Sequence, residues 1–318
     1  MDTLSDLLRV VRLDGAFFYP VEAGMPWSVE ALPSRLLTPH ILPGSEHLIP
    51  YHFLTEGSCW GGVVGEEQVE MRPGDVILFP HGDPHVMSGA PGFRIPDDRV
   101  RVAPDRYPTT QYMGPEGSRT TRFVCGFLGC DLRPFNPLLA ALPRRMHMRG
   151  ISHTGFGEYA RQLALEASSG VPGAESVLTR LAELMFISVV RRYLDELPAG
   201  QTGWLAGLRD EVVGRVLGLI HARPGHPWTL VDLAREGATS RTALAKRFTD
   251  LVGQPPMQYL TQWRMQVAAS RLAEGNAKVA TIAAEVGYES EAAFSRAFKK
   301  ATGLAPGAYR ESRRPRRG

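Results

Sequence analysis

Two short segments near the C-terminus carry side chains suited to binding a polyanion. The first holds three cations and two hydroxyl groups, and its candidate contact residues are Ser240, Arg241, Thr242, Lys246 and Arg247. Lysine and arginine neutralise phosphates, and an arginine can also bridge two acceptors of guanine. We therefore treat this segment as a candidate DNA-contacting surface.

The second segment repeats the layout of the first after 50 residues. Ser240, Leu244, Phe248, Gly253, Pro256 and Tyr259 recur as Ser290, Phe294, Phe298, Gly303, Pro306 and Tyr309. Its candidate contact residues are Ser290, Glu291, Ala292, Ser295 and Arg296. Acidic residues partly offset the charge of this copy, so Arg296 is its main candidate for a base contact.

The repeat predicts two helix-turn-helix units that would position these side chains. Each serine can cap a helix by accepting from unpaired backbone N–H groups of the first turn. The i,i+4 pairs Leu244/Phe248 and Phe294/Phe298 then bury one face and leave the other to solvent or DNA. A long helical stretch over residues 257–274 can hold the two units at a fixed separation.

This double unit resembles the DNA-binding domain of the AraC/XylS family of bacterial transcription regulators over about 100 residues. Residues 240–248, 287–300 and 303–310 carry the resemblance. It implies two recognition helices in successive major grooves, which repeat about every 34 Å along DNA. The alternative is a duplicated helical bundle without a ligand, which explains Phe248 and Phe298 but not the paired Gly-turn-Ser spacing with basic outward positions.

The N-terminal part carries a second resemblance, to the cupin motifs. Residues 74–85 read Gly-x5-Pro-x-Gly-x2-His, and residues 44–56 resemble the first motif with Pro50 in place of its first histidine. The resemblance implies His52, Glu56 and His85 as three ligands for a divalent metal with open coordination positions. The other interpretations are a metal-free effector pocket and a β-barrel that keeps the motif only for its shape.

Three cysteines, Cys59, Cys125 and Cys130, are too few for a disulfide scaffold and fit a reducing compartment. Cys125 and Cys130 lie in one apolar run. On a single strand their odd separation points them to opposite faces, so a bridge between them needs a bend, which glycines at 126 and 129 could provide. They are candidate redox thiols, with buried structural cysteines as the alternative.

Length and composition predict an α+β chain with a sensor domain and a DNA-binding domain. The 318 residues are 43% hydrophobic and 22% charged, as in ordinary globular proteins. From Leu205 onward the charge is +8, whereas the remainder carries −5. We expect a cupin-like β-barrel over 1–134, a helical connector over 135–197, a linker over 198–204 and an all-α domain over 205–318.

The helical pattern begins near Phe156 and continues through a stripe of mainly apolar residues. We expect this stripe to form the interface of a homodimer. Its members are Val177, Leu181, Leu184, Met185 and Ser188. The N-terminus lacks the basic region of a signal peptide, and no apolar run of about 18 residues is present. We therefore expect a cytoplasmic protein without a membrane role.

The order of the domains resembles the cupin-bearing branch of the AraC/XylS family, which includes a regulator that responds to reactive chlorine through cysteine oxidation. The resemblance implies a bacterial, nucleoid-associated transcription activator that senses a small molecule or oxidant and contacts RNA polymerase. It implies no catalytic residue and no certain cofactor. The alternatives are a metal-dependent cupin enzyme with a DNA-binding appendage, which the missing histidine disfavours, and an architectural DNA binder, which the large pocket-forming domain disfavours.

Overall fold

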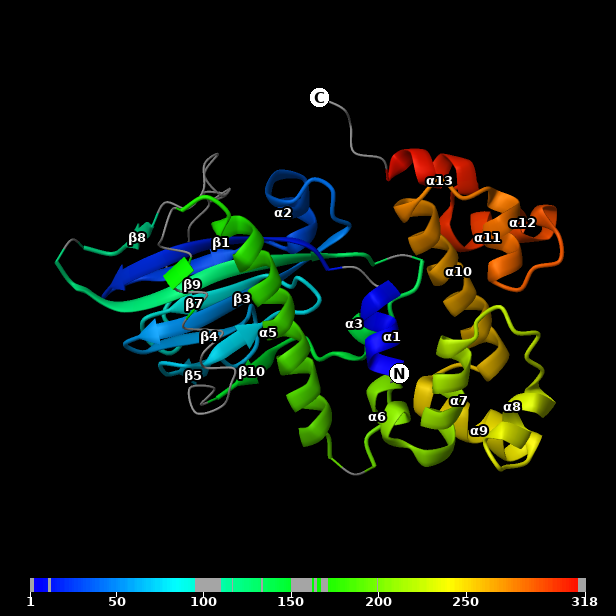
Figure 1. The fold of residues 1–318 in the computed structure, drawn as a ribbon. Coiled ribbons are helices and arrows are strands. Elements are labelled where there is room, and N and C mark those ends of the chain that lie inside the picture. Colours follow the sequence, from blue (N-terminus) through cyan, green and yellow to red (C-terminus); the bar gives the residue numbers. More distant parts are fainter. Residues whose placement is uncertain are drawn as a thin grey trace. The chain divides into compact units, whose positions relative to one another are not determined.

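The computed structural model describes residues 3–10, 13–94, 110–115, 117–132, 134–149, 162, 165–166, 171–198 and 200–313 (Figure 1). These fall into two units. The strand-rich unit comprises 13–131 and 142–193, and the helical unit comprises 1–12, 132–141 and 194–318. The expected α+β class is confirmed, with strands concentrated in the first unit and helices in the second.

The strand-rich unit is built on two hydrogen-bonded sheets. One has six strands in the order β10 (Met146–Met148), β6 (Val76–Leu78), β3 (His47–Glu56), β9 (Arg119–Cys130), β1 (Leu13–Gly24) and β8 (Gln111–Met113). The other has the order β2 (Ser28–Ala31), β7 (His85–Ser88), β4 (Cys59–Val63) and β5 (Val69–Met71). The cupin-like unit is thus rich in strands as expected, but within the described residues its sheets do not close into one barrel.

Strand β9 is the central structural element of the six-stranded sheet. It pairs antiparallel with β1 on one side and with β3 on the other, along most of its twelve residues. Its apolar run from Phe123 to Cys130 is buried, which agrees with a strand covered on both faces. The core nearby contains Trp27 stacked on Phe123, with ring centroids 5.4 Å apart.

Helices α2 (Ser34–Ile41) and α5 (Ala174–Glu196) belong wholly or largely to the strand-rich unit. The predicted stripe on α5 divides between two faces. Leu181 and Met185 are buried, whereas Val177 and Leu184 are 41% and 44% exposed. The start of the helical pattern at Phe156 lies outside the described residues.

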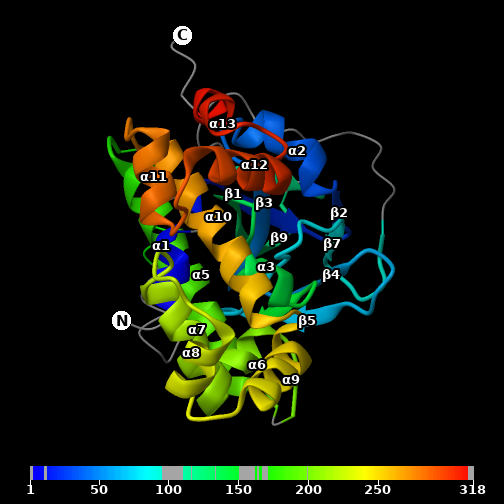
Figure 2. The same cartoon turned by 90° about the vertical axis from the view of Figure 1, so that its right-hand side faces the viewer.

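The helical unit contains the two predicted helix-turn-helix units. Its helices are α1 (Thr3–Val10), α3 (Pro137–Ala141), α6 (Trp204–Arg209), α7 (Glu211–Ala222), α8 (Leu230–Glu236), α9 (Arg241–Val252), α10 (Pro256–Glu274), α11 (Val279–Glu285), α12 (Glu291–Thr302) and α13 (Pro306–Ser312). Helices α8–α9 form the first unit and α11–α12 the second, and α10 runs between them (Figure 2).

The caps and buried pairs form as the repeat predicts. Ser240 accepts from the amide of Ala243 at 3.2 Å, and Ser290 accepts from that of Ala293 at 3.1 Å. Leu244, Phe248, Phe294 and Phe298 are all fully buried. Gly253 and Gly303 end α9 and α12 with φ near +80°, which favours glycine because other residues are strained there.

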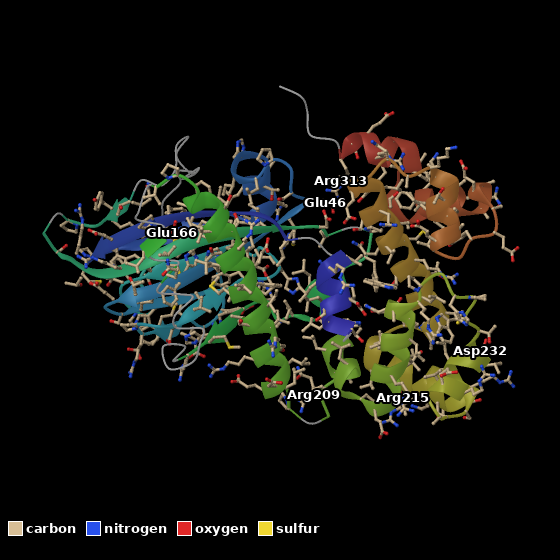
Figure 3. The ribbon with its side chains drawn as sticks, in the orientation of Figure 1. Glu46, Glu166, Arg209, Arg215, Asp232 and Arg313 are labelled. Atoms are coloured by element: carbon tan, nitrogen blue, oxygen red, sulfur yellow. The ribbon has the colours of Figure 1, made fainter. Side chains whose placement is uncertain are left out.

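The helical unit begins earlier than the expected domain boundary. Helix α6 starts at Trp204, inside the predicted linker, and α3 belongs to this unit although it follows β9 in the chain. Arg209 on α6, labelled in Figure 3, donates to the carbonyls of Leu194 and Leu197 and so fixes the chain that enters α6. A bilayer-spanning helix is not found in the described part of the chain, where none combines the necessary length with an apolar composition.

Candidate functional site

The outward face of α9 presents Arg241 and Thr242 directly after the cap Ser240, and all three are exposed. Arg241 has no hydrogen-bond or ion-pair partner among the residues that the structure describes. A guanidinium in the first turn of an exposed helix is free to reach base edges or phosphates. Arg241 is therefore the most available cation of the first unit.

The other two cations of α9 are held by carboxylates of the protein itself. Lys246 Nζ lies 2.6 Å from Asp250 Oδ2, one turn along the same helix. Arg247 donates from Nε and Nη2 to Asp210 Oδ2 at 3.0 and 2.7 Å, while Asp210 Oδ1 caps the first turn of α7. Arg247 thus joins α9 to the N-terminus of α7.

The pairing with Arg247 affects the pKa of the Asp210 carboxylate. Burial works to raise its pKa, but hydrogen bonds from the Val213 amide and from Arg247 outweigh burial and lower the pKa. The carboxylate therefore stays ionised and keeps its hold on Arg247. A DNA contact by Arg247 would have to compete with this ion pair.

The second recognition helix, α12, has one unengaged arginine within the described residues. Arg296 is exposed, and Ser295 before it is half-buried. The cap Ser290, Glu291 and Ala292 are exposed at the helix start, so the acidic residue lies on the accessible first turn as the sequence suggests. Lys299 and Lys300 are exposed in the last turn and add positive charge there.

A second constellation lies in the core of the strand-rich unit. His52 on β3 contacts two groups, with Nδ1 2.9 Å from Cys125 Sγ on β9 and Nε2 2.9 Å from His85 Nε2 at the start of β7. His85 Nδ1 in turn lies 3.0 Å from the carbonyl oxygen of Asp83. All three side chains are buried. The four groups form one continuous hydrogen-bond chain.

The carbonyl at one end of this chain determines the direction of every hydrogen bond. Because the Asp83 oxygen can only accept, His85 donates from Nδ1 and accepts at Nε2. His52 therefore donates from Nε2 and accepts at Nδ1, which leaves Cys125 to donate its S–H. Burial lowers the pKa of His85 to about 4 and that of His52 well below its ordinary value, so both rings are neutral.

The predicted metal set is not assembled in this arrangement. Cys125 and His85 contact opposite nitrogens of His52, so the three side chains do not converge on one point. Glu56 is exposed at the end of β3 and pairs with Arg122 at 2.7 Å. Within the described residues, no group of three His, Cys, Asp or Glu side chains is placed to hold a metal ion. The residues present do not fit the divalent metal that the motif suggests.

The thiols are also arranged differently from the bridge that the sequence allows. Cys125 and Cys130 both lie on β9, and the register of this strand with β3 continues without a shift across residues 125–130. Five residues of strand separate their Cα atoms by about 17 Å, far beyond the reach of a disulfide. All three cysteines are buried thiols that form no disulfide.

Two partners of Cys125 become visible only in the folded chain. Tyr19 lies opposite Cys125 on β1, and its hydroxyl hydrogen-bonds the thiol and works against the burial that raises the pKa of Cys125. Cys59 shares the same core, and burial followed by the charge of Asp75 raises its pKa to about 12. Cross-strand register places Tyr19 opposite Cys125, and the shared core brings Cys59 near it from the other sheet, so spacing along the chain reveals neither relationship.

Known proteins resemble this chain along nearly its whole length. A family profile described as a cupin matches residues 2–195, and one described as a helix-turn-helix domain matches residues 233–312. An AraC-like transcription regulator of Streptomyces antibioticus is 42% identical, covering 99% of this chain and 100% of that protein. Another from Streptomyces lividans is 32% identical, covering 98% of each chain.

A third relative is named for its stimulus. The RCS-specific HTH-type transcriptional activator RclR of Escherichia coli (strain K12) is 27% identical over 98% of each chain. The cupin match includes the whole strand-rich unit, and the helix-turn-helix match includes both capped recognition helices. The chain belongs to the AraC-like transcription regulators, with a cupin domain followed by a helix-turn-helix DNA-binding domain.

Proposed function

We propose that the cupin domain senses a small neutral oxidant at Cys125 and thereby controls DNA binding by the helix-turn-helix domain. The observation that carries the proposal is the buried hydrogen bond from Cys125 to His52. The neutral imidazole accepts the S–H of this thiol at Nδ1, so any change at the sulfur changes this contact. The name of the E. coli relative, which specifies an RCS response, agrees with an oxidant as stimulus.

The chemistry of the site gives oxidation a structural consequence. Hypochlorous acid converts a thiol to a sulfenic acid and releases chloride and a proton, so that sulfur loses two electrons and gains one oxygen. The S–H that donates to His52 is lost, and an oxygen must fit into a closely packed core. Overpacking of this kind typically costs about 1–3 kcal/mol, enough to favour a second arrangement of the unit.

Burial determines which oxidants can act. Because burial raises the pKa of Cys125, the thiol stays protonated at neutral pH and reacts slowly with bulky or charged reagents. A small uncharged molecule can enter the core and meet the thiol that donates to His52. The small-molecule alternative uses the same residues without a covalent step.

A matched pair of variants tests the proposal. Cys125→Ala should abolish the response of a target promoter to hypochlorous acid and keep DNA affinity, because the residue lies outside the DNA-binding domain. Cys130→Ala is the control, since it removes a buried thiol from the same strand without touching His52. A normal response by Cys125→Ala would refute the oxidant proposal, whereas a response lost only in His52→Ala or His85→Ala would favour a non-covalent effector.

We further propose that the active regulator is a cytoplasmic homodimer that activates transcription through RNA polymerase and has no enzymatic activity. Helix α5 supports a dimer, because the exposed Val177 and Leu184 are seven residues apart and share one helix face. Association of two copies would remove both side chains from water. DNA recognition by a dimer also matches two symmetric half-sites.

A further inference from the structure

Segment 132–141 continues directly from β9 but packs inside the helical unit. Asn136 accepts from the amide of Leu139 at 3.1 Å and so caps α3, whose Leu138 and Leu139 are buried. Helix α3 lies against α6 in this unit. The strand that holds Cys125 therefore leads, within ten residues, into the body that carries the recognition helices.

Phe135 attaches this segment to the spacer helix α10 in two ways. Its backbone N–H donates to Gln266 Oε1 at 2.9 Å, and its ring meets Tyr259 edge-on with centroids 5.3 Å apart. Gln266 is buried among the apolar residues of α10. Leaving a buried partner of such a bond unsatisfied costs about 1–3 kcal/mol, so the bond fixes where the segment sits along the helix.

Tyr259 extends the attachment to two more helices. Its hydroxyl accepts from the indole N–H of Trp204 on α6 at 2.7 Å and is hydrogen-bonded to His221 Nε2 on α7, also at 2.7 Å. The His221 ring is neutral, because burial lowers its pKa to about 3, and it stacks on Trp263 with centroids 3.9 Å apart. Movement of Tyr259 would disturb all of these contacts together.

Helix α10 also contacts both recognition helices. Near its start, Tyr259 meets Phe248 of α9 at 5.7 Å between ring centroids. Further along, Met265 and Leu272 share a core with Phe294 and Phe298 of α12. A shift or rotation of α10 would therefore change the separation of the two recognition helices (Figure 2).

From these contacts we infer that Phe135, held by Gln266 and Tyr259, is a positioning residue that couples strand β9 to the spacing of the two recognition helices. The inference rests on the proposed function for the event at Cys125 that moves β9. Because β9 ends at Cys130 and the chain enters the helical unit at Leu132, a displacement of the strand at Cys125 passes along the backbone to the segment that holds Phe135. Coupling between sites is reciprocal, so DNA binding must alter β9 through the same contacts.

Because the coupling is reciprocal, it can be tested with DNA alone, without an effector at the cupin domain. Hydrogen–deuterium exchange of β9 amides is measured on the full chain, free and saturated with a duplex selected from a random DNA pool. We expect DNA to change exchange in β9 by about fivefold or more, the lower end of typical coupling energies. In Gln266→Leu and Phe135→Ala this change should disappear while DNA still binds. Thr261→Ala, an exposed change on the same helix, is the matched control and should behave like the native chain.

Two results would overturn the coupling. One is β9 exchange that is identical with and without DNA in the native chain, and the other is an undiminished change in both Phe135→Ala and Gln266→Leu. If one of these variants does not fold, as judged by its melting curve, the other carries the comparison. Failure of the oxidant proposal is seen separately, as a normal hypochlorous acid response of Cys125→Ala, and it leaves the exchange result unaffected.

Discussion

Tyr51 on β3 and Gly126 on β9 face each other across the sheet, and the tyrosine ring occupies the space that a side chain at 126 would need. A Cβ on residue 126 would lie within 2.6 Å of the ring carbon Cε1 of Tyr51. The ring has little freedom to move, since it is fully buried and meets Phe18 edge-on. Glycine at 126 thus allows β9 to lie close to β3 beside the Cys125–His52 contact.

Gly126→Ala should therefore destabilise the strand-rich unit by about 1–3 kcal/mol, the usual cost of overpacking a core. Urea unfolding monitored by tryptophan fluorescence measures the change. Gly44→Ala is the control, because Gly44 has open space around it. Gly117 also has open space, but its φ of +85° would strain an alanine there. Equal stability of Gly126→Ala and Gly44→Ala would show that the ring can move aside.

The unengaged arginines should dominate DNA recognition. We expect Arg241→Ala and Arg296→Ala each to cost about 1–3 kcal/mol of operator binding and to relax preference at one or two base pairs. The positions affected by the two variants should lie about 10 base pairs apart, one helical turn. Binding profiles on a randomised operator, at two salt concentrations, provide the measurement. Overlapping positions for the two helices would defeat this two-groove arrangement.

Arg247 should behave differently from these two residues. Its sequence position suggests a phosphate contact that weakens all DNA sites evenly when it is removed. Because the structure pairs Arg247 with Asp210, we expect Arg247→Ala and Asp210→Asn to alter binding to a similar extent, by loosening α9 from α7. A large loss of affinity in Arg247→Ala with none in Asp210→Asn would instead establish a direct phosphate contact.

The exposed face of α5 provides a test of dimerisation. Val177→Glu with Leu184→Glu should yield a folded monomer, because both side chains are exposed in the single chain. Leu181→Glu is the contrasting variant and should unfold, since Leu181 is buried in the single chain. Analytical ultracentrifugation and circular dichroism separate the outcomes. A double variant that remains dimeric would place the interface elsewhere.

Low pH should destabilise the strand-rich unit, because its buried histidines are neutral in the folded chain. Burial lowers the folded-state pKa of His85 from 6.5 to about 4, so the unfolded chain binds a proton in this window that the folded chain does not. The free energy of unfolding should be fully retained above pH 6.5 and fall by about 3 kcal/mol between pH 6.5 and 4 from this residue. Urea titrations at pH 7.5 and 4.5 measure the loss. His85→Asn should reduce the pH dependence of the free energy of unfolding. An unchanged pH dependence would contradict a neutral His85 in the folded chain.

The helical unit shows how much local sequence can determine. The serine caps, the buried i,i+4 pairs and the terminal glycines each act within one or two helical turns, so their spacing predicts both helix-turn-helix units. The same locality makes the strand-rich character of the first part readable from its prolines, glycines and short apolar runs. Arg241 and Arg296 could be proposed from sequence because Arg241 follows the cap Ser240 directly and Arg296 lies six residues after the cap Ser290, on the same helix.

Tertiary structure decided which of the candidate residues meet. His52, His85 and Cys125 come from three strands, and only the register between β3 and β9 and the entry into β7 bring them into one hydrogen-bond chain. That register also leaves Glu56 at the surface and holds Cys130 away from Cys125. The pairing of Arg247 with Asp210 and the attachment of Phe135 to α10 join residues 37 and 131 positions apart. Such contacts depend on long-range packing, which the spacing of residues along a chain does not encode.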